Sequence, residues 1–143
     1  MSLNVDFYVL KETGAEASAL LACRLAEKAY LHHKTVYIHC AENKTAAAID
    51  QLLWTFKEES FIPHTNTAAA TAHDAPIVIG YNNDRLNRDY DILINLHPEI
   101  NPDWQKFSRI LDIIANEPLS KELGRQRYKY YREAQCQLNL HEL

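Results

Sequence analysis

The sequence predicts an α/β fold in which a mostly parallel sheet carries helices on both faces. Short β-branched or apolar segments alternate along the chain with longer segments of helical periodicity, which is the pattern of βαβ units. The chain has 143 residues, of which 47% are hydrophobic, and this suffices to bury one core. It has no internal repeat and no long linker. We therefore expect residues 1–143 to form a single domain.

In the first half of the chain, two strands alternate with two helices. The strands are rich in β-branched and aromatic residues, the first helix is rich in leucine and alanine, and Asn43 is a candidate cap for the second. The predicted ranges are Val5–Leu10 (strand), Ala15–Leu31 (helix), Thr35–Cys40 (strand) and Asn43–Phe56 (helix). The apolar side of the second helix carries Ala46, Ile49, Leu52, Leu53 and Phe56.

The second half contains three further strands and a final helix. The segment from Phe107 to Ala115 fits a strand or a short helix, and we favour the strand. Polar composition predicts loops elsewhere, at Thr65–Asp74 and Asn82–Arg88, and a tail from Gln137 to Leu143. The remaining predicted elements are strands Pro76–Gly80 and Tyr90–Leu96, the second buried on both faces, and a helix from Leu119 to Ala134.

Composition limits the classes of function. A net charge of −4 and a pI of about 5.9 argue against broad binding to nucleic acid, which requires many neutralised phosphates. No apolar run is long enough to span a bilayer, and the first residues do not resemble a secretion signal. The cysteines Cys23, Cys40 and Cys136 are odd in number and far apart, as expected of reduced, mostly buried thiols in the cytoplasm.

The sequence lacks the motifs of nucleotide, metal and nucleophile sites. A Rossmann-like layout normally binds nucleotides through a glycine-rich turn after the first strand, but the only glycines are Gly14, Gly80 and Gly124. Asn43-Lys44-Thr45 resembles the end of a phosphate loop without its glycines. No histidine or cysteine pair has metal-ligand spacing. We therefore expect no cofactor, no metal and no catalytic site, although scattered catalytic groups would leave no motif.

Basic charge is concentrated in the final predicted helix. Residues 121–132 carry five positive charges and one negative charge, a net of +4, so the rest of the chain sums to −8. At about 100° per residue, several of these side chains form one face, which we call the basic stripe. The basic stripe consists of Lys121, Arg125, Tyr128, Lys129 and Arg132. The opposite side, which we expect to face the core, carries Leu119, Leu123, Tyr130 and Ala134.

Two interpretations of the basic stripe remain open from the residues alone. Arginine and lysine beside an aromatic ring suit an acidic peptide, particularly one that ends in a free carboxylate after an apolar residue. The alternative is a solvated helix face, which most charge runs are. Only Glu122 is available to neutralise the stripe. Gly124 costs about 1 kcal/mol relative to alanine inside a helix, and indicates either a close approach to the backbone or a kink without function.

A second candidate surface is the aromatic patch, defined by Trp54 and Phe61. Trp54 lies about 140° from Ile49 on the second helix, off its apolar side, and Phe61 follows in the connection. Two exposed aromatic rings close together are typical of a protein-binding surface. Equally, both side chains could pack into the domain from the loop.

Four segments, in order over nearly the whole chain, resemble a known family. They are Leu53-Trp54, Glu59-Ser60-Phe61-Ile62-Pro63-His64, Asp91-Ile92-Leu93-Ile94 and Arg125-x-Arg127-Tyr128-Lys129-x-Tyr131-Arg132. The chain is similar on these segments to the chi subunit family of the bacterial DNA polymerase III clamp loader. The resemblance implies a Rossmann-like three-layer fold without nucleotide chemistry.

The resemblance also implies a non-catalytic adaptor in DNA replication. It implies that the basic stripe binds the acidic C-terminal tail of the single-stranded DNA-binding protein. Trp54 and Phe61 would face the psi subunit of the clamp loader or a helicase that competes for the same surface. The protein would then be a monomer or a one-to-one heterodimer with psi, would contact DNA only indirectly, and would need no membrane. The alternatives are a Rossmann-like nucleotide-binding enzyme and a direct nucleic-acid binder that uses the basic helix.

Overall fold

A computed structural model describes residues 3–55, 64–66, 75–81, 86 and 88–143. These residues form strands, three α-helices and one short 3-10 helix, η1. The strands are β1 (Asn4–Val9), β2 (Val36–Cys40), β3 (His64–Asn66), β4 (Ile77–Tyr81), β5 (Ile92–Asn95), β6 (Arg109–Ile114) and β7 (Gln137–Glu142). The helices are α1 (Ala15–Leu31), α2 (Asn43–Thr55), η1 (Trp104–Lys106) and α3 (Pro118–Glu133). None of the described helices has the length and apolar character that crossing a membrane requires.

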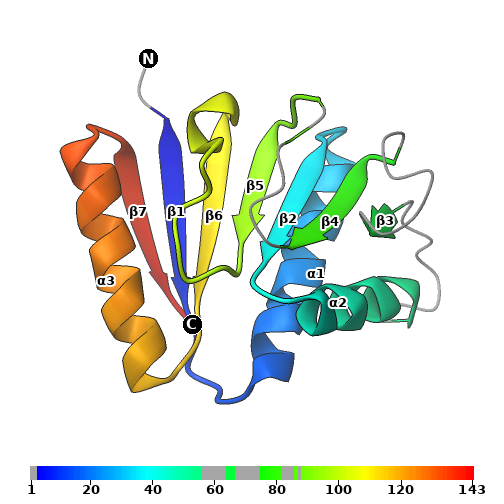
Figure 1. Ribbon diagram of the computed structural model, residues 1–143, viewed down its shortest axis with the longest axis horizontal. Helices are drawn as coiled ribbons and strands as arrows, with labels where there is room; N and C mark the ends of the chain where they lie inside the picture. Colours follow the sequence, from blue (N-terminus) through cyan, green and yellow to red (C-terminus); the bar gives the residue numbers. More distant parts are fainter. Residues whose placement is uncertain (1–2, 56–63, 67–74, 82–85, 87) are drawn as a thin grey trace.

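The strands form one parallel sheet, in the order β3-β4-β2-β5-β6-β1-β7 (Figure 1). Every pairing is parallel, so the carboxyl ends of the strands meet at one end of the sheet. The chain leaves β1 for α1 and leaves the adjacent strand β6 for α3. These two helices cover opposite faces of the sheet. The connection after β1 and the connection after β6 therefore leave these adjacent strands toward opposite faces. Such a switch point creates a crevice at the carboxyl ends of the strands.

Each face of the sheet has its own hydrophobic core. Cys23 and Ala26 of α1 pack with Ile49 and Leu53 of α2 against one face. Tyr131 of α3 packs on the other face, with a set of aromatic and aliphatic partners. That set includes Phe7, Tyr37, Tyr90, Trp104 and Phe107. Burial on both faces explains why β5 and β6 are mostly apolar and show no alternation of apolar and polar residues.

The predicted α/β fold with a parallel sheet and helices on both faces is confirmed, with several boundaries moved. The segment 107–115, ambiguous in the sequence, contains strand β6. Asn43 is the first residue of α2 rather than its cap, because the N–H of Ala46 donates to the carbonyl of Glu42. Thr65 and Asn66 belong to β3 instead of a loop, and residues 67–74 lie outside the described part of the chain.

The predicted tail is strand β7 at the sheet edge. Its six residues pair in parallel with β1, and the N–H of Leu143 donates to the carbonyl of Val9. His141 stacks on Tyr8, with ring centroids 4.7 Å apart, and its Nε2 lies 3.1 Å from Oδ1 of Asp6. The prediction of a tail was wrong because Gln137–Glu142 has little local strand character. It gains order from β1, which is far away in sequence.

The buried side of α3 also differs from the prediction. Leu119 is 69% exposed and Tyr130 47% exposed, Ala134 is exposed, and Leu123 is only partly buried. The buried residues are instead Gly124, Arg127 and Tyr131, whose spacing of three and four residues defines one helix face. The apolar pattern misled because the buried face contains an arginine whose charge is neutralised inside the protein.

Candidate functional site

A groove lies between α3 and the carboxyl ends of β1, β6 and β7. Its volume is about 510 Å³. All five residues of the basic stripe line it: Lys121, Arg125, Tyr128, Lys129 and Arg132. The lining is completed by Gly124 of α3, Phe7 and Val9 of β1, Ile114 of β6, and Leu140 and Glu142 of β7. The structure therefore brings the basic stripe together around one concavity, beside the switch point between β1 and β6.

The charges of the groove are mostly unneutralised. Arg125 pairs with Glu122 one turn earlier, at 3.2 Å, and both side chains are largely exposed. Such an exposed pair contributes about 0–1 kcal/mol, so the carboxylate of a ligand can displace it. Within the described part of the chain, no carboxylate lies within ion-pair distance of Lys121, Lys129 or Arg132. The groove thus offers several cations to an anionic ligand.

The floor of the groove is apolar and aromatic. Tyr128 is half-buried, and its ring centroid lies 5.2 Å from that of Phe7 at an interplanar angle of 52°. Leu140 is 56% exposed and faces the same concavity. An apolar side chain placed here would lose water from both surfaces, which is favourable. The groove therefore combines a charged wall with an apolar base.

Gly124 lets α3 lie close to the sheet. A Cβ atom at this position would lie 2.6 Å from Cδ1 and 2.9 Å from Cγ1 of Ile114 in β6. Of the two explanations left open by the sequence, a close approach is therefore the correct one. The approaching group is Ile114 of the same chain.

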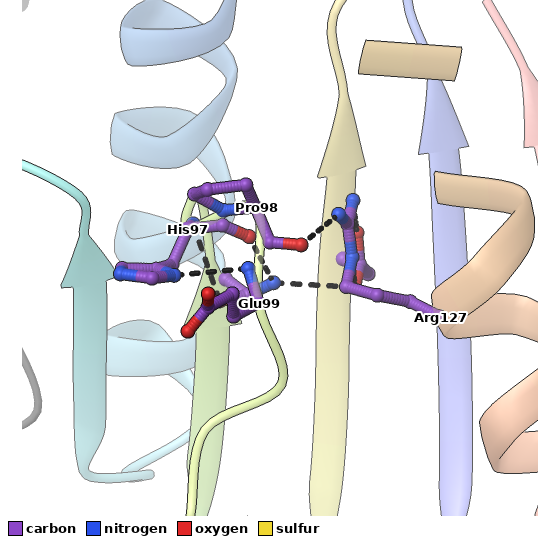
Figure 2. A network of polar contacts seen from close by, with 6 residues as sticks. His97, Pro98, Glu99 and Arg127 are labelled. Atoms are coloured by element: carbon purple, nitrogen blue, oxygen red, sulfur yellow. Dashed lines mark hydrogen bonds and ion pairs between the residues drawn. The ribbon is translucent and has the colours of Figure 1, made fainter. Parts of the chain in front are cut away.

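Arg127 ties α3 to the sheet and to the loop after β5 (Figure 2). Its Nε and Nη2 each donate to Asp112 at 2.9 Å, one to each carboxylate oxygen, and its Nη1 donates to the carbonyl of Pro98 at 2.8 Å. Asn95 donates to the same carboxylate at 3.3 Å. Burial raises the pKa of Asp112, and Arg127 and Asn95 act against that rise. Arg127 thus holds α3 in place and is not available to a ligand.

The loop after β5 is ordered by His97. Its Nδ1 accepts a hydrogen bond from the N–H of Glu99 at 2.9 Å, which requires that nitrogen to be unprotonated. Its ring stacks on that of His39 with centroids 4.5 Å apart. Burial is the main cause that lowers the pKa of His97, and Arg127 adds to the effect while Glu99 opposes it. The neutral ring therefore fits this site best.

The sequence did not identify every residue of the groove. Phe7, Val9, Ile114, Leu140 and Glu142 belong to strands or to the predicted tail, and nothing local connects them to α3. The sequence does contain a signal for the burial of Arg127. Asp112 interrupts the apolar run from Ile110 to Ile114, and a carboxylate in a buried strand requires a cation nearby. The aromatic patch cannot be assessed in the same way, because Phe61 and the side chain of Trp54 lie outside the described residues.

The described residues contain no group of three or more histidine, cysteine or acidic side chains placed to hold a metal ion. The first βα connection, between β1 and α1, contains one glycine, Gly14, and so lacks a phosphate-binding loop. The fold and the groove together define a class of protein, namely a Rossmann-like α/β domain with a basic groove.

Comparison with known proteins assigns the family. Residues 2–139 match the family model described as DNA polymerase III chi subunit, HolC. The chain is 37% identical over 140 residues to DNA polymerase III subunit chi of Pseudomonas aeruginosa, with 98% of this chain and 96% of that protein covered. It is 33% identical over 140 residues to the same subunit of Escherichia coli K12, with 95% of each covered. The chain belongs to the DNA polymerase III chi subunit family, whose members are accessory rather than catalytic subunits.

Haemophilus influenzae has a further relative, also named DNA polymerase III subunit chi, which is 34% identical over 133 residues. The alignment covers 92% of each chain. Among solved structures, the crystal structure of T4 UvsW is similar with a TM-score of 0.63 at 10% identity, over 99% of this chain and 41% of that one. At this identity the similarity extends to the fold alone.

Proposed function

We propose that the protein is a non-catalytic adaptor of the clamp loader, which binds the acidic C-terminal tail of the single-stranded DNA-binding protein in the α3 groove. Membership of the chi subunit family supports a replication role. The observation that carries the proposal is that the whole basic stripe lines one groove with an apolar floor. Carboxylates of the tail would bind Lys121, Arg125 and Lys129, and its apolar end would rest against Tyr128.

The expected affinity is near micromolar. Two or three charge-assisted hydrogen bonds contribute about 1.5–3 kcal/mol each. One buried aromatic side chain adds about 1.5–3 kcal/mol. The loss of translational freedom and the ordering of the peptide offset much of this sum. The upper end of the sum, about 12 kcal/mol, less the smallest cost of association, about 4 kcal/mol, leaves about 8 kcal/mol, which sets the tightest expected dissociation constant near 1 μM.

A peptide titration tests the proposal. We expect a peptide with several acidic residues and a C-terminal phenylalanine to bind the wild-type protein at low salt in calorimetry. Arg125→Ala should weaken binding about tenfold or more, since one charge-assisted bond is lost. Arg24→Ala removes an exposed arginine from α1, on the opposite face, and should leave the affinity unchanged. No binding to wild type, or equal binding by Arg125→Ala, would rule out tail capture.

We further propose that the aromatic patch binds the psi subunit or a competing helicase. Support comes from the family membership and from the positions of Trp54 and Phe61 in the sequence. Phe61→Ala and Trp54→Ala should each abolish binding of that second partner in a pull-down and spare the tail peptide. Loss of both activities together would instead assign these aromatic residues a role in folding.

A further inference from the structure

Among the residues that the structure describes, no strand pairs with the outer edge of β7. β7 is the last strand of the sheet, next to β1. The N–H groups of Gln137 and Leu143 donate to the carbonyl groups of Leu3 and Val9. The backbone N–H and C=O groups of the odd-numbered residues of β7 therefore point toward β1. Because the backbone groups of a strand alternate in direction, those of Leu138, Leu140 and Glu142 point away from the sheet. No described strand pairs with them.

Two of these residues, Leu140 and Glu142, also face the groove with their side chains. In the register of β1 and β7, Leu140 lies beside Phe7 and Glu142 beside Val9. Both pairs belong to the α3 face of the sheet, and all four residues line the groove. The basic stripe of α3 and two residues of the edge strand β7 therefore line one groove, and Figure 1 shows α3 beside β7. An extended peptide in this groove could reach both.

The spacing of the cations matches an extended peptide. Lys121, Arg125 and Lys129 follow one another at four-residue intervals, which is about 6 Å along a helix. Side chains on one face of a strand repeat every two residues, about 6.6 Å apart. Alternate acidic side chains of an extended chain thus meet successive turns of α3. An acidic helix would not have its backbone groups free to pair with β7.

We propose that the peptide bound in the groove adds to the outer edge of β7 as a further, parallel strand, with alternate acidic side chains on the basic stripe. This rests on the tail-binding function proposed above and specifies how the partner is held. The parallel direction places the C-terminal carboxylate at the carboxyl end of β7. There it meets Lys121, Arg125 and the positive end of the α3 dipole, whose attraction must exceed the repulsion from Glu142 in the same lining.

Amide hydrogen exchange measured by NMR tests the proposal on the full chain. On saturation with the acidic peptide, the amides of Leu138, Leu140 and Glu142 should exchange at least tenfold more slowly. The amides of Asn139 and His141 point toward β1 and serve as internal controls that change little. Slow exchange at Asn139 and His141 together with the others would indicate general rigidification of β7, and would overturn strand addition.

Backbone N-methylation provides a second, register-sensitive measurement. Two peptides of the same sequence carry N-methyl groups at odd or at even positions, so that only one set of amides can point toward β7. Strand addition requires one peptide to lose at least tenfold in affinity and the other to bind as the unmodified peptide does. Equal affinities would overturn strand addition and leave groove binding intact. If the unmodified peptide does not bind at all, the tail-binding function itself fails.

Discussion

Gly124 and Ile114 determine how closely α3 approaches the sheet. Alanine at an ordinary helical position stabilises by about 1 kcal/mol relative to glycine. At Gly124, however, the added Cβ would overlap the buried side chain of Ile114. Overpacking of this kind costs about 1–3 kcal/mol. We therefore expect Gly124→Ala to lower the free energy of unfolding by about 1 kcal/mol in urea denaturation. Gly124→Ala would also push α3 outward and alter the groove.

Gln126 provides a comparison for Gly124, because its exposed side chain lies in the middle of the same helix. Gln126→Ala should change stability by a few tenths of a kcal/mol, the difference in helix propensity. If Gly124→Ala raised stability by the full propensity difference, the close contact with Ile114 would not be what requires glycine here.

His97 makes stability depend on pH. Its pKa in the folded protein lies below the ordinary value of about 6.5, chiefly because the ring is partly buried. The unfolded chain therefore binds a proton more readily than the native protein as pH falls through about 6.5. The stability that neutral His97 contributes is complete above that pH and declines below it.

We expect the free energy of unfolding to fall from pH 8 to pH 5.5 by more in the wild type than in His97→Gln. Glutamine does not titrate, and its carbonyl can still accept the Glu99 N–H. Urea unfolding at both pH values provides the measurement. Parallel pH profiles for the two proteins would show that another group dominates the acid sensitivity.

At the scale of elements, the pair of Arg127 and Asp112 joins α3 to β6. Both side chains are buried, and the guanidinium holds both carboxylate oxygens. Removal of one partner leaves a buried charge uncompensated, which costs about 3–5 kcal/mol. We expect Arg127→Met to lower the free energy of unfolding by that amount in urea denaturation. If the substitution displaces α3, the affinity for the acidic peptide should fall as well.

The double variant Arg127→Met with Asp112→Leu separates the pair from the packing. With both charges removed, apolar side chains of similar volume can fill the space, and such replacements are often neutral or stabilising. We expect the double variant to recover most of the stability lost in Arg127→Met. If its loss equalled the sum of the two single losses, Arg127 and Asp112 would be energetically independent.

For the whole molecule, the local charge of the groove opposes the net charge of the protein. Residues outside the segment 121–132 sum to −8, so an acidic peptide is repelled at long range and attracted at the groove. The contacts in the groove act over about 3–4 Å and the net charge over tens of ångströms, and salt screens the longer distance first.

We expect the affinity for the acidic peptide to fall as salt rises from 50 to 300 mM, because contact pairs with the basic stripe dominate binding. The association rate should fall little or even rise over the same range, because screening also removes long-range repulsion. Stopped-flow fluorescence and calorimetry measure the two quantities. An affinity that rose with salt would show that apolar contacts carry the binding.

Local sequence predicted the strands β1, β2, β4, β5 and β6 and the three α-helices, because their periodicity and residue types are properties of adjacent residues. It failed for β7, and it assigned Leu119 and Tyr130 to the core. In both places the outcome depends on partners distant in sequence: β1 pairs with β7, and Asp112 neutralises Arg127.

The sequence by itself determined the alternation of strands and helices, the absence of a glycine-rich phosphate loop, and the concentration of basic charge between Lys121 and Arg132. Each of these features is a property of residues that are adjacent in the sequence. Only the tertiary structure decided which side of α3 is buried, that the C-terminal residues form an edge strand, and that Phe7, Ile114 and Leu140 provide an apolar floor for the basic stripe. Those outcomes depend on which surfaces meet when the sheet closes against α3, and a buried ion pair or a parallel strand pairing leaves little trace in local periodicity.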